Sequence, residues 1–215
     1  MRTFNVEQRS PEWLRARLGR PTASRAADAL AFLKPKKDEA PAPAKARIDH
    51  AEELAFERVT GGLIEHYVNT AMMRGEELEP DARAAYEAQT GSLVDEIGFC
   101  LHDSVDAGAS PDGLVGEDGL IEIKCPASQA KVAHMWATGD VSDYIPQVEW
   151  QLWVTGRKWC DICVYDPRLH HCGMELLVVR HEMTEEARQR LDVVVPEFLA
   201  FVGEVEATIR KRVTR

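Results

Sequence analysis

The stretch of sequence that most constrains the fold is Ile121–Cys125, near the middle of the chain, where apolar and charged side chains alternate. Successive side chains of a β-strand point to opposite faces, so the two isoleucines and the cysteine share one face of this segment. Glu122 and Lys124 share the other. The apolar face can pack on a helix while the charged pair projects into a cleft. The sequence therefore predicts a core strand that presents a carboxylate beside an ammonium group.

A second carboxylate lies ten residues before Glu122, in the segment Ser110-Pro111-Asp112-Gly113. The intervening residues 114–121 are typical of a β-hairpin whose turn is bounded by glycines. Such a hairpin can bring Asp112 beside Glu122, with Lys124 one step further along the strand. We therefore expect three charged side chains to meet at one end of the hairpin.

Two carboxylates on rigid strands supply the hard oxygen ligands that Mg²⁺ and Mn²⁺ prefer. A divalent cation held there would lower the pKa of a bound water and offset the charge of a phosphate under attack. Nearby carboxylates favour the charged form of Lys124, so we expect this lysine to position groups and stabilise charge rather than act as a free base. The pattern also fits a polar hairpin with a solvated Glu–Lys pair, and the motif alone leaves both interpretations open.

Helical patterns lie on both sides of the hairpin. Ser10-Pro11-Glu12 is typical of a helix start, with serine as the N-cap and proline at the first helical position. Pro80 and Pro196 are points where a predicted helix could be interrupted. We expect helices at 11–18, 23–30, 48–59, 70–89, 129–137, 144–155 and 184–212. We expect strands at 92–101, 114–115, 120–125, 159–165 and 174–179, and a turn at 108–113.

This order of elements predicts an α/β or α+β fold, with a short central sheet flanked by helices. The length of 215 residues fits a single domain over residues 1–215. Residues 34–47 are rich in lysine, proline and alanine, and we expect them to form a flexible loop.

The formal charge of −10 is unevenly distributed. Residues 1–50 carry a net charge of +5, and the remaining 165 residues therefore carry −15. A globally acidic chain argues against non-specific coating of nucleic acid but allows a local basic groove. No apolar run approaches the roughly 18–20 residues of a membrane span. The polar segment Met1–Gln8 has no apolar signal region, so we expect no membrane association and no secretion.

The five cysteines are odd in number and irregularly spaced, which favours a reducing cytoplasm over a disulfide scaffold. Cys160 and Cys163, followed by His170-His171-Cys172, raise the question of a zinc site. A strand would place Cys160 and Cys163 on opposite faces, so zinc is disfavoured. An iron–sulfur cluster would need a fourth cysteine, and Cys100 is poorly placed for it.

Several ordered stretches of the chain resemble the YqaJ-like viral recombinase family, the lambda-exonuclease type within the PD-(D/E)xK nuclease superfamily. These matches extend over nearly the whole length and are more specific than the core motif alone. The matching stretches are WLRARLGRPTAS (13–24), GEELEPDARAAYEAQTG (75–91), ASPDGLVGEDGLIEIKCP (109–126), YIPQVEWQLWVT (144–155), YDPR (165–168) and VPEF (195–198).

The resemblance implies a restriction-endonuclease-like core, with a short mixed central sheet flanked by helices. It implies a Mg²⁺-dependent hydrolase, with Mn²⁺ as a substitute metal, that digests double-stranded DNA ends processively from 5′ to 3′. The implied products are mononucleotides and 3′ single-stranded overhangs. Family members form ring-shaped homotrimers and act with a single-strand annealing protein in recombination. The resemblance also implies a phage or prophage origin and action in the bacterial cytoplasm.

The resemblance assigns roles to the hairpin residues. Asp112 and Glu122 correspond to metal ligands, together with the backbone carbonyl of Ile123. Lys124 corresponds to the catalytic lysine. Glu79, on the helix before the sheet, corresponds to the acidic residue that completes the site through a water. Without the resemblance, Glu79 would be one acid in a solvated run.

The resemblance also assigns groups that contact DNA. Gln147 corresponds to a glutamine that contacts the phosphate, and Gln151 shares its helix face one turn later. Arg17, Ser24 and Ser110 correspond to residues that bind the terminal 5′-phosphate; arginine supplies a bidentate fork and serine a short hydroxyl donor. Without the resemblance, these would be ordinary surface helix and turn residues. A phosphate pocket set back from the metals would explain polarity and processivity.

The acidic total charge fits a sliding ring that has a basic inner surface and an acidic exterior. We expect the basic N-terminal third, including Arg15, Arg20 and Arg25, to line the DNA path.

Two alternatives to the exonuclease remain open from the sequence. One is a structure-specific or restriction-type endonuclease on the same core. The other is a DNA-end-binding recombination module with weak or lost catalysis, which the intact set of Asp112, Glu122, Lys124 and Glu79 argues against.

Overall fold

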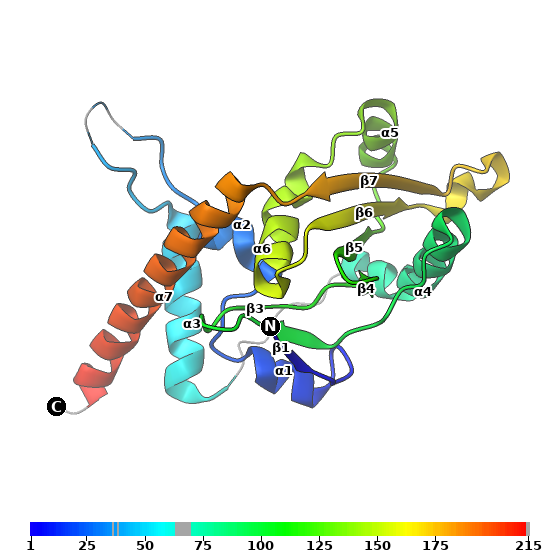
Figure 1. Cartoon of the computed structure of the whole chain (residues 1–215). Helices are drawn as coiled ribbons and strands as arrows, with labels where there is room; N and C mark the ends of the chain where they lie inside the picture. The colour runs from blue at the N-terminus through cyan, green and yellow to red at the C-terminus, as the bar shows by residue number, and fades with distance from the viewer. Residues whose placement is uncertain (36, 38, 63–69, 214–215) are drawn as a thin grey trace.

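A four-stranded mixed sheet forms the centre of one half of the molecule (Figure 1). Its strands, in spatial order, are β4 (Gly113–Val115), β5 (Gly119–Lys124), β6 (Trp159–Tyr165) and β7 (Leu176–Glu182). The β5–β6 pair is parallel, whereas β4–β5 and β6–β7 are antiparallel. The computed structural model describes residues 1–35, 37, 39–62 and 70–213.

Helices cover both faces of this sheet, as the sequence predicted. Helix α4 (Thr70–Thr90) packs on the face that carries Ile121 and Ile123. Helices α5 (Gln129–Thr138) and α6 (Ile145–Thr155) cover the opposite face, which carries Glu122 and Lys124. The predicted α/β class with a short mixed sheet between helices is therefore confirmed.

The crossover between the parallel strands β5 and β6 places α6 over the charged face of β5. Parallel neighbours need such a crossover, and helices usually supply it. Ser128 begins α5 because its hydroxyl accepts a hydrogen bond from the backbone N–H of Lys131 at 3.3 Å. Gly139 and Gly156 end α5 and α6 in the left-handed conformation, with φ of 70° and 71°. A short 3₁₀ turn, Ser142–Tyr144, joins the two helices.

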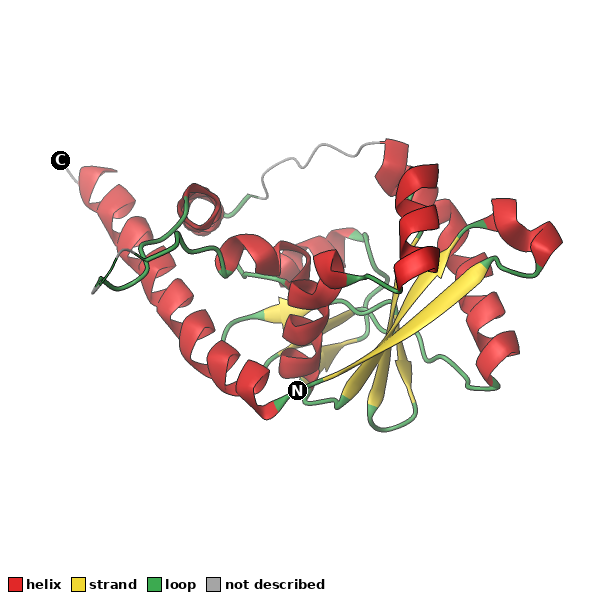
Figure 2. Cartoon of the chain, turned by 90° about the horizontal axis from the view of Figure 1, so that it is seen from above, coloured by secondary structure: helices red, strands yellow, loops and turns green. Residues whose placement is uncertain are grey.

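A second layer of helices packs beside a small antiparallel sheet. The sheet contains β1 (Arg2–Phe4), β2 (Phe99–Leu101) and β3 (Gly108–Ala109), in that order. The long helices α3 (Lys45–Thr60) and α7 (Glu185–Val213) pack against each other at the edge of the molecule (Figures 1 and 2). The shorter helices of this layer are α1 (Pro11–Arg17), η1 (Ala23–Arg25) and α2 (Ala26–Ala29), whereas η3 (Pro167–Cys172) connects β6 to β7.

The predicted strand at 92–101 is wrong for most of its length. Only Phe99–Leu101 is a strand, and it pairs with β1 and β3. Asp95 instead forms an isolated bridge with Leu114 of β4. Residues 92–101 therefore contact the four-stranded sheet at Asp95 and then pass, through Gly98, into the small sheet at β2. Because the segment changes sheets, it cannot form one continuous strand. The predicted turn at 108–113 likewise contains β3 at its start, a two-residue strand that local sequence does not reveal.

Neither proline interrupts its helix. α4 continues through Pro80, and α7 continues through Pro196. Each proline removes one backbone hydrogen bond, but both flanks are held by tertiary packing. Buried Ala82 lies after Pro80, and buried Val195 and Phe198 flank Pro196.

The segment predicted as a loop at 34–47 leaves the body of the protein after α2 and returns to α3, which begins at Lys45. Its base is a short antiparallel ladder, in which the backbone N–H of Leu33 donates to the carbonyl of Ala42 at 2.8 Å. The guanidinium of Arg47 lies over the rings of Phe32 and Phe198 and anchors this base. Residues 36 and 38 lie outside the described residues, and the flexibility of the loop stays a prediction.

No helix in the described ranges has the length and apolar character needed to cross a membrane.

All five cysteines are free thiols, and only Cys172 is exposed.

The close approach at Gly98 generates a stability prediction. A Cβ atom there would lie 2.0 Å from the carbonyl oxygen of Val6 and 2.6 Å from that of Phe4. Backbone atoms cannot move aside cheaply, so we expect Gly98→Ala to lower the free energy of unfolding by about 1–3 kcal/mol in urea titrations. Gly75→Ala, in α4 with no atom within 4 Å of the new methyl group, is the control. It should stabilise by up to about 1 kcal/mol, because alanine favours helix. Equal stabilities of the two variants would contradict this packing argument.

Candidate active site

The hairpin brings Asp112 to the end of β5, as the sequence predicted. Gly113 pairs with Ile121 in the β4–β5 ladder, so Asp112 lies just beyond the last pair, opposite Glu122. One Oδ atom of Asp112 accepts a hydrogen bond from the backbone N–H of Ile123 at 2.6 Å. This bond fixes the carboxyl group directly beside the next residue of the strand.

The carboxylate of Glu122 is buried, with 2% exposure, and is held by three side-chain donors. Lys124 Nζ and Gln147 Nε2 each donate to Oε1 at 2.6 Å. Gln151 Nε2 donates to Oε2 at 2.6 Å. Lys124 also donates to Gln147 Oε1 at 3.0 Å, which closes a small network between β5 and α6. Both oxygens of a buried charge are thereby satisfied, as burial requires.

Lys124 is held in its charged form. Burial opposes the charge, but Glu122 and Asp112 outweigh it and raise the pKa of Lys124 above its usual value. The ammonium group also lies 5.1 Å from the ring centre of Tyr144, and Lys131 lies 4.8 Å from the same ring centre. A charged lysine donates hydrogen bonds and stabilises anions, in agreement with the expectation from the sequence.

Asp112 is in the opposite electrostatic situation. Burial, followed by the negative charges of Glu122 and Glu79, raises the pKa of Asp112 well above its usual range. Lys124 and the backbone N–H of Ile123 oppose this shift only in part. The charged form of Asp112 is therefore disfavoured in this site.

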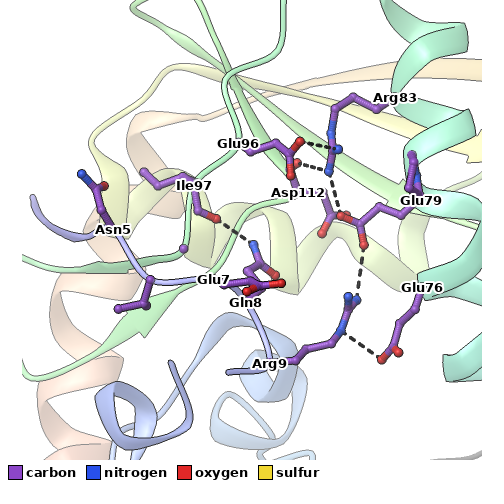
Figure 3. Close-up of a pocket in the computed structure, with 13 residues that line it drawn as sticks. Asn5, Glu7, Gln8, Arg9, Glu76, Glu79, Arg83, Glu96, Ile97 and Asp112 are labelled. Carbon is purple, nitrogen blue, oxygen red and sulfur yellow. Dashed lines mark hydrogen bonds and ion pairs between the residues drawn. The ribbon is translucent and has the colours of Figure 1, made fainter. Parts of the chain in front are cut away.

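Glu79 reaches the site from α4, through a cleft of about 440 Å³ that Asp112 also lines (Figure 3). Two arginines hold its carboxylate. Arg83 donates to Oε1 at 2.9 Å, and Arg9 donates to Oε2 at 3.3 Å. Arg83 also contacts the backbone carbonyl of Asp112 at 3.4 Å and a carboxylate oxygen of Glu96 at 2.9 Å. Glu79 and Asp112 therefore line one cleft, whereas Glu122 is hydrogen-bonded to Lys124 and Gln147 on the α6 side of β5.

The residues predicted to bind a 5′-phosphate also form one cluster. Arg17 donates to the hydroxyls of Thr22 at 3.1 Å and Ser24 at 3.3 Å. The guanidinium lies 4.1 Å from the ring centre of Trp13, whose indole N–H donates to the hydroxyl of Ser110 at 2.8 Å. Burial lowers the pKa of Arg17 to about 10, against an opposing contribution from Glu57. A partly desolvated guanidinium beside hydroxyl groups is well suited to bind a phosphate.

Three other arginines predicted to line the DNA path are engaged with acids of the chain. Arg20 binds Asp106 at 2.7 Å, and Arg15 lies 3.8 Å from a carboxylate oxygen of Glu12. Arg25 pairs with Asp28 and Glu53. These pairs reduce the positive potential of that surface, and its role in DNA binding stays a prediction.

Cys160 and Cys163 point to opposite faces of β6, as the strand geometry required. Cys160 is buried among the α6-side residues, and Cys163 is buried among the α4-side residues. They therefore cannot bind one ion together.

Three residues that shape the site were not predicted from the sequence. Gln151 was expected to share a helix face with Gln147, but its full burial against Glu122 was not predicted. A second glutamine four residues along an apolar helix was the available signal. Trp13 and Arg83 gave no such signal, because their partners Ser110 and Glu79 are identified only by the fold.

The oxygen atoms of the site are of the kind that binds a hard divalent cation, although the side chains are not arranged as a complete set of metal ligands. In the described ranges, no three or more histidine, cysteine, aspartate or glutamate side chains converge as ready metal ligands. Glu122 instead binds its lysine and glutamine neighbours. Two carboxylates and the carbonyl of Ile123 are nevertheless oxygen donors of the kind Mg²⁺ prefers. A bound cation would offset both the burial and the neighbouring negative charges that raise the pKa of Asp112.

A comparison with protein families gives a match to the YqaJ-like viral recombinase domain over residues 12–158, more than half of the chain. The chain belongs to the YqaJ-like viral recombinase family. The matched segment contains Arg17, Glu79, Asp112, Glu122, Lys124 and Gln147, whereas Arg9 lies just before it.

Solved structures support this assignment. The alkaline exonuclease LHK-Exo of Laribacter hongkongensis is 39% identical, with a TM-score of 0.82 over 95% of this chain and 99% of that chain. LHK-Exo in complex with dAMP gives a TM-score of 0.83 at the same identity and coverage. A phage-related exonuclease of Haemophilus somnus 129PT, 13% identical over 90% of this chain and 96% of that chain, shares the fold with a TM-score of 0.67. Among curated proteins, ExoD of Escherichia coli K12 is 34% identical over 68 residues, which are 32% of this chain and 76% of ExoD.

The charge imbalance at Asp112 predicts a pH-dependent stability. An acid whose pKa is raised by folding destabilises the folded state fully above that raised pKa, and the destabilisation shrinks as the pH falls from the raised pKa toward the ordinary pKa of an aspartate. In EDTA at pH 8, we therefore expect Asp112→Asn to raise the free energy of unfolding by about 1 kcal/mol. The asparagine carbonyl can still accept the hydrogen bond from Ile123.

The measurement is urea unfolding at several pH values, with Glu77→Gln on the exposed side of α4 as a control that should change little. The stability difference between Asp112→Asn and the wild type should shrink toward acidic pH. An Asp112→Asn protein less stable than the wild type at pH 8 would refute the electrostatic argument.

Proposed function

We propose that the protein is a metal-dependent DNA exonuclease that hydrolyses double-stranded DNA from 5′ ends. The observation that carries this proposal is the network of Asp112, Glu122 and Lys124 at the end of β5, joined to Gln147 of α6. The family assignment and the 39% identity with an alkaline exonuclease over 95% of the chain support the same activity.

Asp112, Glu122 and the carbonyl of Ile123 would hold Mg²⁺, with Mn²⁺ as a substitute. The ion would supply an activated water nucleophile and offset charge on the phosphate under attack. Glu79 would complete the site from α4, since its carboxylate lines the same cleft as Asp112. Glu122 must exchange some of its present hydrogen bonds for this role.

Lys124 and Gln147 are the groups that would contact the scissile phosphate. The charged ammonium group of Lys124 can stabilise the additional negative charge that develops on the phosphate oxygens. Gln147 spans from Lys124 to Glu122 and so fixes the relative position of the two groups. Gln151 holds the second oxygen of Glu122 and keeps its carboxylate oriented.

Polarity would come from the cluster of Arg17, Ser24 and Ser110. Ser110 lies two residues before Asp112, so a terminal phosphate bound there would lie beside the metal site. After each cut, the new 5′-phosphate could move into this cluster and advance the DNA, which would make digestion processive and leave a 3′ single-stranded overhang and mononucleotides. The homotrimeric ring, the single-strand annealing partner and action in the bacterial cytoplasm rest on the family resemblance.

The central test is digestion of linear duplex DNA with Mg²⁺, followed by strand-specific end labels. We expect the 5′-phosphorylated strand to be degraded to mononucleotides and a covalently closed circle to be spared. Lys124→Ala should reduce the rate by about a thousandfold, because it removes a cation from the reacting centre. Removal of Mg²⁺ with EDTA should abolish digestion by the wild type.

Other outcomes of this experiment would point to the alternatives. Nicking of the closed circle would identify an endonuclease on the same core. Binding of DNA ends without cleavage of any substrate by the wild type would identify a recombination module without catalysis.

The phosphate cluster makes a separate prediction about end recognition. Under single-turnover conditions, we expect the wild type to degrade 5′-phosphorylated ends about 10- to 100-fold faster than 5′-hydroxyl ends, the value of one charge-assisted contact. Arg17→Ala should lose most of this preference. Arg20→Ala, whose guanidinium already binds Asp106, is the matched control and should retain it. Equal rates on both ends by the wild type would exclude the phosphate pocket.

A further inference from the structure

Arg9 has an unusual backbone conformation at the rim of the cleft. Its φ of 70° makes it the one non-glycine residue with positive φ among those that the structure describes. The left-handed region is disfavoured for residues with a Cβ atom, and such a conformation persists only where neighbouring contacts impose it.

The contacts that impose this conformation lie on both sides of Arg9. The backbone N–H of Ser10 donates to the carbonyl of Glu7 at 3.1 Å and closes a tight turn. The side chain of Gln8 donates to the carbonyls of Ile97 at 2.8 Å and Pro111 at 3.0 Å. Since Pro111 directly precedes Asp112, this turn is fastened to the strand that carries the site.

The turn directs the Arg9 side chain across the cleft to α4 (Figure 3). Its Nε lies 2.9 Å from Oε1 of Glu76, and its Nη2 lies 3.3 Å from Oε2 of Glu79. The Arg9 side chain is 50% exposed, so it can leave these partners for solvent at little cost.

The second arginine of the cleft behaves differently. Arg83 is 14% exposed and is fixed by Glu79, Glu96 and the carbonyl of Asp112. Arg83 is therefore held more firmly in the wall of the cleft, whereas Arg9 is the more exposed of the two positive charges. The acids that line the cleft are Glu7, Glu76, Glu79, Glu96 and Asp112.

We propose that Arg9 is an internal counter-ion of this cleft, which neutralises Glu76 and Glu79 and leaves Glu79 when a divalent cation binds. The proposal rests on the metal site proposed above. Arg9 and a divalent cation compete for the charge of the same carboxylate and repel each other, so each weakens the binding of the other. In the absence of metal, Arg9 thereby neutralises acids of the cleft. When a metal binds, Arg9 moves away from Glu79 and makes its carboxylate available.

Because Arg9 has a left-handed backbone conformation, its side chain can be removed by substitution with glycine without disturbing the turn. Arg9→Gly removes the guanidinium and places at this φ the residue that adopts it most readily, so the turn remains intact. Arg9→Lys keeps the charge in the same backbone. Asp112→Asn removes a proposed metal ligand and tests the metal site itself.

The experiment is titration of Mn²⁺ into the full chain without DNA, followed by electron paramagnetic resonance and by calorimetry. We expect Arg9→Gly to bind Mn²⁺ about two- to fivefold more tightly than the wild type, the range of a partly exposed ion pair. Arg9→Lys should bind within about twofold of the wild type. Asp112→Asn should bind much more weakly, and thermal melting should show that every variant is folded.

The outcomes separate this proposal from the proposed function. If Asp112→Asn abolishes binding but Arg9→Gly leaves it unchanged or weaker, the metal site stands and the counter-ion proposal fails. If Asp112→Asn binds Mn²⁺ as the wild type does, the metal site itself fails. If Arg9→Gly leaves Mn²⁺ affinity unchanged and weakens DNA binding, with a shallower salt dependence, Arg9 is a DNA phosphate ligand instead.

Discussion

The buried carboxylate of Glu122 is the constraint on which the rest of the site depends. A carboxylate that is 2% exposed must have strong partners, and Lys124, Gln147 and Gln151 supply them. Two of these partners belong to α6, so the parallel crossover from β5 to β6 must bring that helix over the charged face of the strand. The helix caps, the left-handed glycines and the apolar packing of α5 and α6 together hold α6 over the charged face of β5.

The site also contains an electrostatic conflict that an ordinary core would not contain. Asp112 is buried beside Glu122 and Glu79, and this burial and the two negative charges raise the pKa of its carboxyl group. Lys124 and Arg83 offset part of the charge from opposite sides of the β5 end, and Arg9 offsets another part from the rim. Stored repulsion of this kind is typical of sites that bind cations or anionic substrates, because the ligand relieves it. The fold supplies the packing that keeps such groups together.

The sequence predicted what depends on neighbours along the chain and missed what depends on neighbours in space. The alternation in Ile121–Cys125 and the cap at Ser10 are local signals, and the structure agrees with both. The short strands β1 and β3 have no local signal, since each exists only because β2 lies beside it. The phosphate cluster was assigned from a family resemblance, but the Trp13 bridge that joins Arg17 to Ser110 could be found only in three dimensions.

The two-residue separation of Ser110 and Asp112 has a geometric consequence. Two residues of extended backbone span at most about 7 Å, and both ends of this segment are fixed, one by Trp13 and the other by Ile123. The backbone therefore fixes the distance between the hydroxyl that would hold a DNA end and the carboxylate that would direct its cleavage. In the proposed function, this fixed distance would make every cycle advance by the same step, whatever the sequence of the DNA.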